Sequence, residues 1–202
     1  VLTGGNHTWH KRDVVPFLES SSRVLRPANF PEGAPGRGLA VVDSGRGAPL
    51  AVVSLVGRVF MQAVECPFRV GAELVERALR ETPLVLVDFH AEATAEKMAL
   101  GWHLAGRATA VVGTHTHVQT SDARILEGHT AYITDAGMTG PTESVIGMRS
   151  DSSLARFVTG LPQRFEPASG PTALSGVVIE ADPDTGRALS IEPVAIPAGG
   201  ES

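Results

Sequence analysis

The middle of the chain contains the run Leu84-Val85-Leu86-Val87-Asp88-Phe89-His90. Four consecutive aliphatic residues are typical of a β-strand that is covered on both faces, as in a parallel sheet. Helical patterns lie on either side of it, at 71–81 and 92–104, and a second apolar strand is expected at 108–112. This alternation of strands and helices predicts an α/β fold with parallel strands at its centre.

Hairpin-like and helical patterns flank this central part, and the mixture predicts layered sheets with helices outside. Asp151 and Ser152 are both candidate N-caps for the last helix. The expected flanking elements are a strand end at 1–3, a helix near 11–20, a hairpin of 39–43 with 50–56, a strand pair at 123–126 and 130–134, a candidate lid at 137–149, a helix at 151–161, and a hairpin of 174–181 with 188–196.

Composition restricts the class of protein. The 202 residues are 43% hydrophobic, which is enough for one substantial core, so residues 1–202 are predicted to form a single domain. A net charge of −5 argues against a general nucleic-acid binder but leaves room for a nucleotide substrate. One cysteine permits no internal disulfide, and no apolar run approaches the roughly 20 residues of a membrane span. We therefore expect a cytoplasmic protein with no membrane partner.

Polar side chains follow three of the expected strands. His115 and His117 come after the strand at 108–112, two residues apart, which predicts that they share a face. His90 ends its own strand, and Asn6 follows the strand end at 1–3. Imidazole is a common metal ligand, and an amide oxygen suits a hard or borderline ion. Open α/β sheets place their sites at the carboxyl ends of strands, so these residues predict a metal site.

Taken one at a time, these residues also fit simpler roles. A single histidine can be a surface or hydrogen-bonded residue, and the segment Gly5-Asn6-His7 can be a plain turn, since glycine and asparagine both tolerate left-handed backbone. It is their combination that favours a metal site. Together, Gly5-Asn6-His7 and Gly113-Thr114-His115-Thr116-His117 resemble the signature of the calcineurin-like metallophosphoesterase superfamily.

Longer motifs narrow this resemblance to the bacterial YmdB-like phosphodiesterases, which act on phosphodiesters that include cyclic nucleotides. The similarity extends over nearly the whole chain. The matching segments are Gly4–Trp9, Leu25–Asn29, Gly57–Met61, Cys66–Phe68, Asp88–Thr94, Gly113–Thr120 and Thr134–Pro141.

The resemblance implies a four-layer αββα sandwich of the metallophosphoesterase type, with two bound metal ions. Asn6, His90 and His115 would hold one ion and His117 the other, while His7 would donate a proton to the leaving oxygen. Two ions can stabilise both ends of an in-line displacement and generate hydroxide at neutral pH, and an imidazolium assists departure of an alkoxide. Iron or manganese is expected, with magnesium or zinc as alternatives, because His and Asn accept several ions.

The family's remaining ligands, an Asp and a later Glu-Asn pair, precede the Gly-Asn-His motif, where this chain has no residues. We therefore expect a domain that is N-terminally incomplete, lacks its first one or two βα units and has little activity on its own. The favoured function is a metal-dependent phosphodiesterase or phosphatase. The alternatives are a metal-containing regulatory protein that binds a nucleotide or RNA without hydrolysis, and a mononuclear hydrolase of C–N or ester bonds. A homo-oligomer is possible.

Four further residues carry open interpretations. Arg58 could contact a phosphate or be a surface residue. Asp135 could orient a histidine or be an ordinary turn carboxylate. Trp9 could stack on a base or pack in the interior, and Cys66, which precedes a proline, is predicted to be structural.

Overall fold

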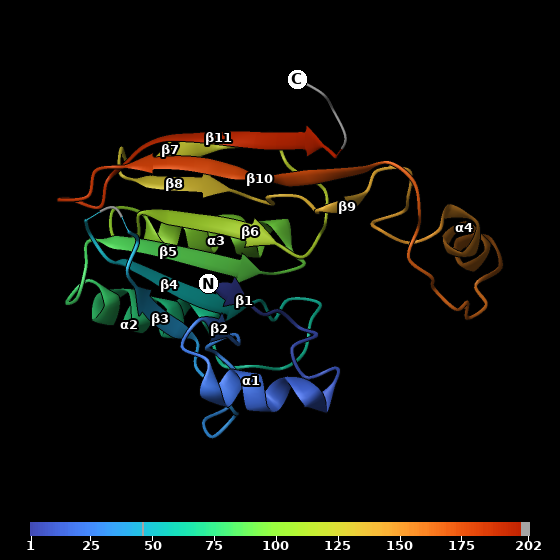
Figure 1. Cartoon of the computed structure of the whole chain (residues 1–202), viewed down its shortest axis with the longest axis horizontal. Coiled ribbons are helices and arrows are strands. Elements are labelled where there is room, and N and C mark those ends of the chain that lie inside the picture. The colour runs from blue at the N-terminus through green and yellow to red at the C-terminus, as the bar shows by residue number, and fades with distance from the viewer. Residues whose placement is uncertain (46, 199–202) are drawn as a thin grey trace.

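The structure is a computed structural model, and it describes residues 1–45 and 47–198. Its centre is a six-stranded sheet in the order β3-β4-β5-β6-β8-β7 (Figure 1). The inner strands β4, β5, β6 and β8 run parallel, and the edge strands β3 and β7 are antiparallel to their neighbours. The strands are β3 (Leu39–Val42), β4 (Leu50–Val56), β5 (Leu84–His90), β6 (Ala110–Thr114), β7 (Arg124–Leu126) and β8 (Thr130–Ile133). The predicted parallel centre is confirmed.

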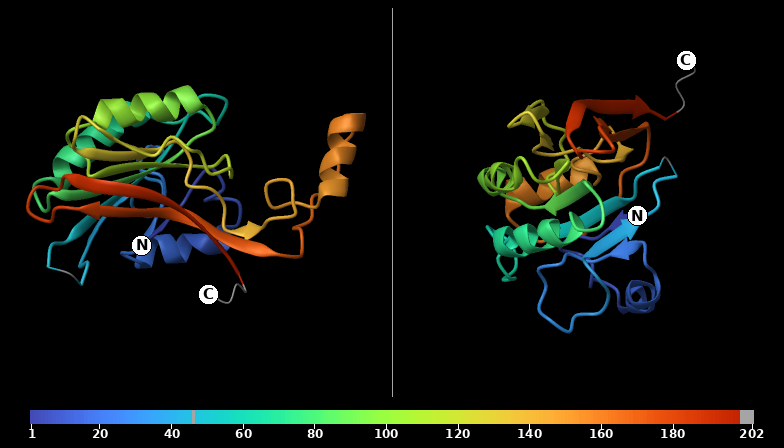
Figure 2. Two further views of the ribbon diagram at one scale, coloured as in Figure 1. Left: turned by 90° about the horizontal axis from the view of Figure 1, so that it is seen from above. Right: turned by 90° about the vertical axis from the view of Figure 1, so that its left-hand side faces the viewer.

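Helices α2 (Pro67–Ala78) and α3 (Thr94–Leu104) cover one face of this sheet (Figure 2). Strand β5 turns Val85, Val87 and Phe89 toward them, and these three side chains have no exposed surface. Leu100 of α3 is equally buried in the same cluster. The alternation of fully and partly buried residues along β5 means that its other face meets a different layer.

That layer is a second, antiparallel sheet of β9 (Gly140–Pro141), β10 (Thr172–Ala181) and β11 (Ala188–Pro197). It packs on the opposite face of the large sheet through a small apolar cluster centred on Ala110, Ala131 and Ala188 (Figure 2). The order of layers is therefore helices, six-stranded sheet and second sheet. These are three of the four layers of the expected αββα sandwich, and the α/β class is confirmed.

The N-terminal segment lies beside the sheets. Strand β1 (Leu2–Thr3) pairs in parallel with β2 (Val24–Leu25), and between them come a 3-10 turn, η1 (Arg12–Val14), and the helix α1 (Val15–Ser20). The helix predicted over 11–20 is thus split in two. Pro16 lies in the first turn of α1, where its missing N–H costs no hydrogen bond.

Helix α4 (Ser150–Thr159) stands away from the rest of the molecule, within the long β9–β10 connection (Figures 1 and 2). The predicted N-cap was wrong, because Arg149 occupies that position and no side chain caps the helix. The carboxylate of Asp151 is held instead by the Arg149 guanidinium and by its neighbour's backbone N–H.

Two other predicted boundaries were displaced. The strand expected at 108–112 is β6, two residues later, because the backbone N–H groups of Arg107 and Ala108 still donate to Leu104 at the end of α3. The helix expected at 71–81 begins at Pro67, since proline fits a first helical turn. Among the described residues, no helix is long and apolar enough to cross a membrane.

Candidate metal site

Parallel pairing brings the polar strand ends to one edge of the sheet. Val56 at the end of β4 lies opposite His90 at the end of β5, and His90 lies opposite Thr114 at the end of β6. Gly5, in the turn after β1, approaches the same place: a Cβ atom added to it would lie 2.5 Å from His90 Nε2. Only glycine allows the turn to come this close, and this approach places Asn6 against His90.

Three of the predicted ligands meet here. His90 Nε2 lies 2.9 Å from Asn6 Oδ1 and 3.0 Å from His115 Nδ1, and the two imidazole rings cross edge to face with centroids 4.7 Å apart. Asn6, His90 and His115 come from three segments far apart in the sequence. We call them the Asn6–His90–His115 group.

The neighbours of the two imidazoles favour one position for the proton on each ring. Thr114 Oγ1 donates its only hydrogen to Asp88 Oδ1, at 2.8 Å, so it can only accept from His90 Nδ1, at 3.1 Å. His115 Nε2 lies 3.0 Å from the Glu92 carboxylate and therefore carries the other proton. In the neutral rings, His90 Nε2 and His115 Nδ1 are then left with lone pairs. Both lone pairs, and the Asn6 oxygen, face one another.

Both rings are held neutral by their surroundings. Burial lowers the pKa of His90 to about 4, and the nearby His115 and Lys97 act in the same direction. Burial also lowers the pKa of His115, against the opposing effect of the Glu92 carboxylate. Neutral imidazole is the form that binds metal ions, so the group is suited to a cation at neutral pH.

The prediction that His115 and His117 share one face of a strand was wrong. Strand β6 ends at Thr114, and His115 and His117 have φ angles of 98° and 67° in the following turn. Positive φ is unfavourable for such residues and persists only where the surroundings impose it. His115 contacts His90 and Glu92, whereas the ring of His117 contacts the Ile146 carbonyl oxygen.

A buried ion pair holds this turn at the residue between the two histidines. Asp135 Oδ2 accepts from the backbone N–H of Thr116, at 2.9 Å, and from its hydroxyl, at 2.6 Å. Lys97 Nζ donates to the same carboxylate oxygen, at 2.9 Å, and the side chains of Lys97 and Asp135 are only 1% and 0% exposed. Asp135 thus binds Thr116 and Lys97. Among the described contacts, it makes no hydrogen bond to a histidine ring.

His117 lies outside the Asn6–His90–His115 group. Its ring is exposed, and Nδ1 lies 3.1 Å from the Ile146 carbonyl oxygen. This contact places part of the candidate lid, 137–149, beside the turn. The assignment of His117 to a second ion stays a prediction.

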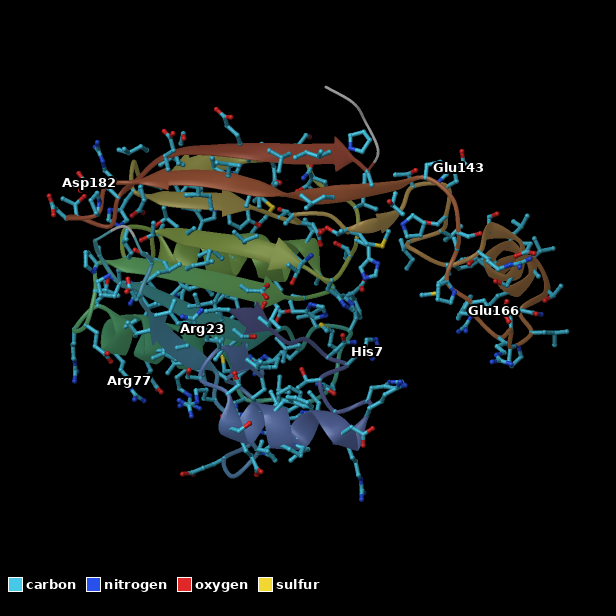
Figure 3. The ribbon with its side chains drawn as sticks, in the orientation of Figure 1. His7, Arg23, Arg77, Glu143, Glu166 and Asp182 are labelled. Atoms are coloured by element: carbon cyan, nitrogen blue, oxygen red, sulfur yellow. The ribbon has the colours of Figure 1, made fainter. Side chains whose placement is uncertain are left out.

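His7 is exposed and lines a cleft of about 390 Å³ next to His90 and Lys11. Figure 3 shows its side chain on the side of the molecule where β4, β5 and β6 end. Its ring meets that of His10 edge to face, with centroids 5.6 Å apart. His7 is therefore next to the group but makes no described hydrogen bond to it through its ring.

Sequence reasoning missed three side chains that organise this site: Glu92, Thr114 and Lys97. The sequence does carry a signal for Glu92, since it follows His90 by two residues and carboxylates commonly orient metal-binding histidines. Lys97 carried no such signal, because a lysine on a helix is usually solvated. Trp9, by contrast, packs edge-on against Phe30 and is half buried, with ring centroids 5.6 Å apart.

Within residues 1–45 and 47–198, no three His, Cys, Asp or Glu side chains are grouped as a metal site would require. The third member of the Asn6–His90–His115 group is an amide oxygen. The donor set is two imidazole nitrogens and one amide oxygen, which fits first-row transition ions better than a purely oxygen-bound ion such as calcium.

Comparisons with known proteins agree with this fold and with these motifs. The family model described as YmdB-like protein matches residues 1–194. A Bacillus subtilis protein named 2′,3′-cyclic-nucleotide 2′-phosphodiesterase is 52% identical over 195 residues, which cover 96% of this chain and 74% of that protein.

Two solved structures are also similar. A hypothetical protein from Thermus thermophilus superposes with a TM-score of 0.90 at 43% identity, covering 98% of this chain and 76% of its own. A structure described as a novel phosphatase from Mycoplasma pneumoniae superposes with a TM-score of 0.87 at 34% identity, and the match covers 96% of this chain and 71% of that chain.

The fold is therefore an α/β fold of the metallophosphoesterase type, and the chain is a hydrolase. More particularly, it belongs to the YmdB-like family, as its motifs predicted.

Proposed function

We propose that this protein is a metal-dependent phosphodiesterase that hydrolyses phosphodiesters such as 2′,3′-cyclic nucleotides. The phosphodiesterase class is supported by the family and by the Bacillus subtilis relative. The metal dependence, the two-ion arrangement and the roles of individual residues are our proposal.

The lone pairs of the Asn6–His90–His115 group carry this proposal. Asn6 Oδ1 lies 2.9 Å and His115 Nδ1 lies 3.0 Å from His90 Nε2, and each of these three atoms can donate an electron pair. With the ring protons directed to Thr114 and Glu92, the ring nitrogens that face one another and the Asn6 oxygen are all hydrogen-bond acceptors. A cation can accept electron pairs from all three atoms, and the residues present therefore fit a metal ion.

Asn6, His90 and His115 would hold one ion, and His117 would contribute to the second. Bound metal ions supply charge stabilisation for the phosphoryl oxygens and a hydroxide nucleophile at neutral pH. Glu92 and Thr114 orient the two ligating rings through their other nitrogens. Iron or manganese is the proposed metal, with magnesium or zinc as alternatives.

His7 is the proposed proton donor to the leaving oxygen. Its side chain is exposed at the cleft beside His90, outside the Asn6–His90–His115 group, so its ring is free of the ligand role. A leaving alkoxide is a strong base, and proton transfer from a positioned imidazolium assists its departure. Lys11, in the same cleft, adds positive charge where an anionic substrate would enter.

The experiment combines metal content with hydrolysis. The full-length gene product is purified as wild type, His90→Ala and His103→Ala, and each is assayed for bound metal and for hydrolysis of bis(p-nitrophenyl) phosphate and 2′,3′-cyclic AMP. His103 is exposed on α3 and serves as the matched control. We expect metal and turnover in wild type and His103→Ala, and neither in His90→Ala.

Metal without hydrolysis would favour the alternative, a regulatory protein that binds a nucleotide or RNA. A wild type without metal would contradict both. A cytoplasmic location and a homo-oligomer stay predictions.

A further inference from the structure

The connection from β4 to α2 carries an exposed aromatic side chain four residues after Val56, the strand end that pairs with His90. Phe60 is 89% exposed and has a φ angle of 61°. A bulky residue with positive φ is a backbone outlier, and such outliers gather where a segment holds a ligand. Exposure and an unfavourable backbone together mean that the fold presents this ring to solvent.

A buried carboxylate holds the segment in this shape. Glu96 on α3 is only 6% exposed, and its two oxygens accept from the backbone N–H groups of Arg58 and Val59, each at 3.2 Å. Gly57 allows the approach, because a Cβ atom there would lie 2.6 Å from Ala91 Cβ and 2.7 Å from Glu96 Oε2. The hydrogen bonds from Arg58 and Val59 to Glu96 therefore hold the turn that carries Phe60 against α3.

The segment starts directly at the metal-site edge of the sheet. Val56 is paired with His90 across neighbouring strands, which lie about 4.8 Å apart, and the Gly57 N–H donates to the His90 carbonyl oxygen at 2.9 Å. Phe60 follows Val56 by four residues, so the backbone extends at most about 14 Å from the sheet edge. The connection runs on the side where β4, β5 and β6 end (Figure 1).

We propose that Phe60 is a stacking platform for the nucleobase of the substrate and so makes the enzyme prefer nucleoside phosphodiesters over base-free ones. The proposal rests on the proposed function of the neighbouring site. An aromatic face stacks on any base, since every base has a π-face. Phe60 would therefore favour nucleotides as a class without distinguishing one base from another. Trp9, the other aromatic candidate, is engaged with Phe30 and half buried.

The test compares a nucleotide with a base-free analogue. The full-length protein is prepared as wild type, Phe60→Ala, Phe60→Trp and Phe157→Ala. Each is assayed on 2′,3′-cyclic AMP and on methyl riboside 2′,3′-cyclic phosphate, with the dissociation constant for 2′,3′-cyclic AMP measured separately. Phe157 is the matched control, because it is 80% exposed on α4, which stands away from the rest of the molecule.

We expect Phe60→Ala to raise KM for 2′,3′-cyclic AMP about tenfold or more, with kcat nearly unchanged and the base-free substrate unaffected. Phe60→Trp and Phe157→Ala should behave like the wild type. An unchanged KM in Phe60→Ala, or an equal change for both substrates, overturns the platform while the phosphodiesterase assignment stands.

If the wild type hydrolyses neither substrate, the proposed function fails, and the dissociation constants decide the platform by themselves. Weakening of about tenfold in Phe60→Ala alone would support it. Equal dissociation constants in the wild type and Phe60→Ala would overturn it.

Discussion

The imidazole rings of His90 and His115 at the sheet edge are held by hydrogen-bond partners, and these partners fix the orientation of each ring. His90 is oriented by Thr114 and Asp88, and His115 by Glu92. His7 has no such described partner for its ring apart from the edge contact with His10. This difference fits the proposed roles, because ligands must be fixed and a proton donor must reach the substrate.

Replacing His7 tests the proton-donor role. We expect His7→Ala to lower kcat by about 10²- to 10⁴-fold while the metal content is unchanged, because general acid catalysis contributes on that scale. Rates on a phosphodiester and metal content by elemental analysis are measured on the same preparation. His10→Ala, which removes the neighbouring ring, should keep its rate. Full activity in His7→Ala would show that the proton comes from elsewhere.

The buried pair of Lys97 and Asp135 makes a prediction for stability. Asp135→Asn leaves the Lys97 charge buried without its partner, and we expect a loss of about 3–5 kcal/mol in the free energy of unfolding at pH 7. The double variant Lys97→Met with Asp135→Asn should recover part of this loss. Urea unfolding measures both. Equal stability in wild type and Asp135→Asn would mean that the pair is not needed to hold the turn at Thr116.

The same carboxylate predicts a pH dependence. Burial alone would raise the pKa of Asp135, but hydrogen bonds from Thr116, Lys97 and Gly137 outweigh it and hold the pKa below 3.8. Because the unfolded chain binds the proton more readily, this contribution is present above pH 3.8 and is lost as the pH falls through the folded-state pKa. Stability of the wild type should therefore fall more steeply below pH 4 than that of Asp135→Asn. Parallel pH profiles would contradict this.

At the scale of the elements, helices α3 and α4 differ in how far their leucine side chains are buried. Leu100 of α3 is fully buried against the sheet, whereas Leu154 of α4 is 63% exposed. Helical periodicity alone predicts a buried apolar face for both helices. The difference arises from where the chain places them: α3 connects two neighbouring parallel strands, and α4 lies within a long connection, away from the sheets (Figure 2).

Alanine substitutions in these helices should separate the two cases. We expect Leu100→Ala to lower the free energy of unfolding by about 2–5 kcal/mol, because it leaves a cavity in the core. Leu154→Ala should change it by less than about 0.5 kcal/mol, as for other exposed positions. Urea denaturation compares them directly. A large loss in Leu154→Ala would show that α4 is covered by a partner in solution, as a homo-oligomer would require.

At the scale of the whole molecule, the candidate metal site links β1, β5 and β6 with the turns that follow them. An ion that binds only the folded chain stabilises it by mass action, by about 2.7 kcal/mol at a concentration 100 times Kd. For a domain of this size we expect Mn²⁺ to raise Tm by about 5–10 °C after removal of metal by a chelator. Asn6→Ala should lose this response, and His103→Ala should keep it. An equal Tm with and without Mn²⁺ in the wild type would argue against the site.

Sequence alone was sufficient for the α/β class, the parallel centre and the family, and it named Asn6, His90 and His115 as residues that the structure brings together. These depend on local patterns: apolar runs, helical spacing and polar residues at strand ends. The different contacts of His115 and His117, the contacts of Glu92 and Lys97 and the exposure of Phe60 were decided only by tertiary structure. The orientation of an imidazole ring and the sign of a φ angle depend on hydrogen-bond partners from other strands and helices. Those partners are distant in the sequence, so they cannot be predicted from local patterns.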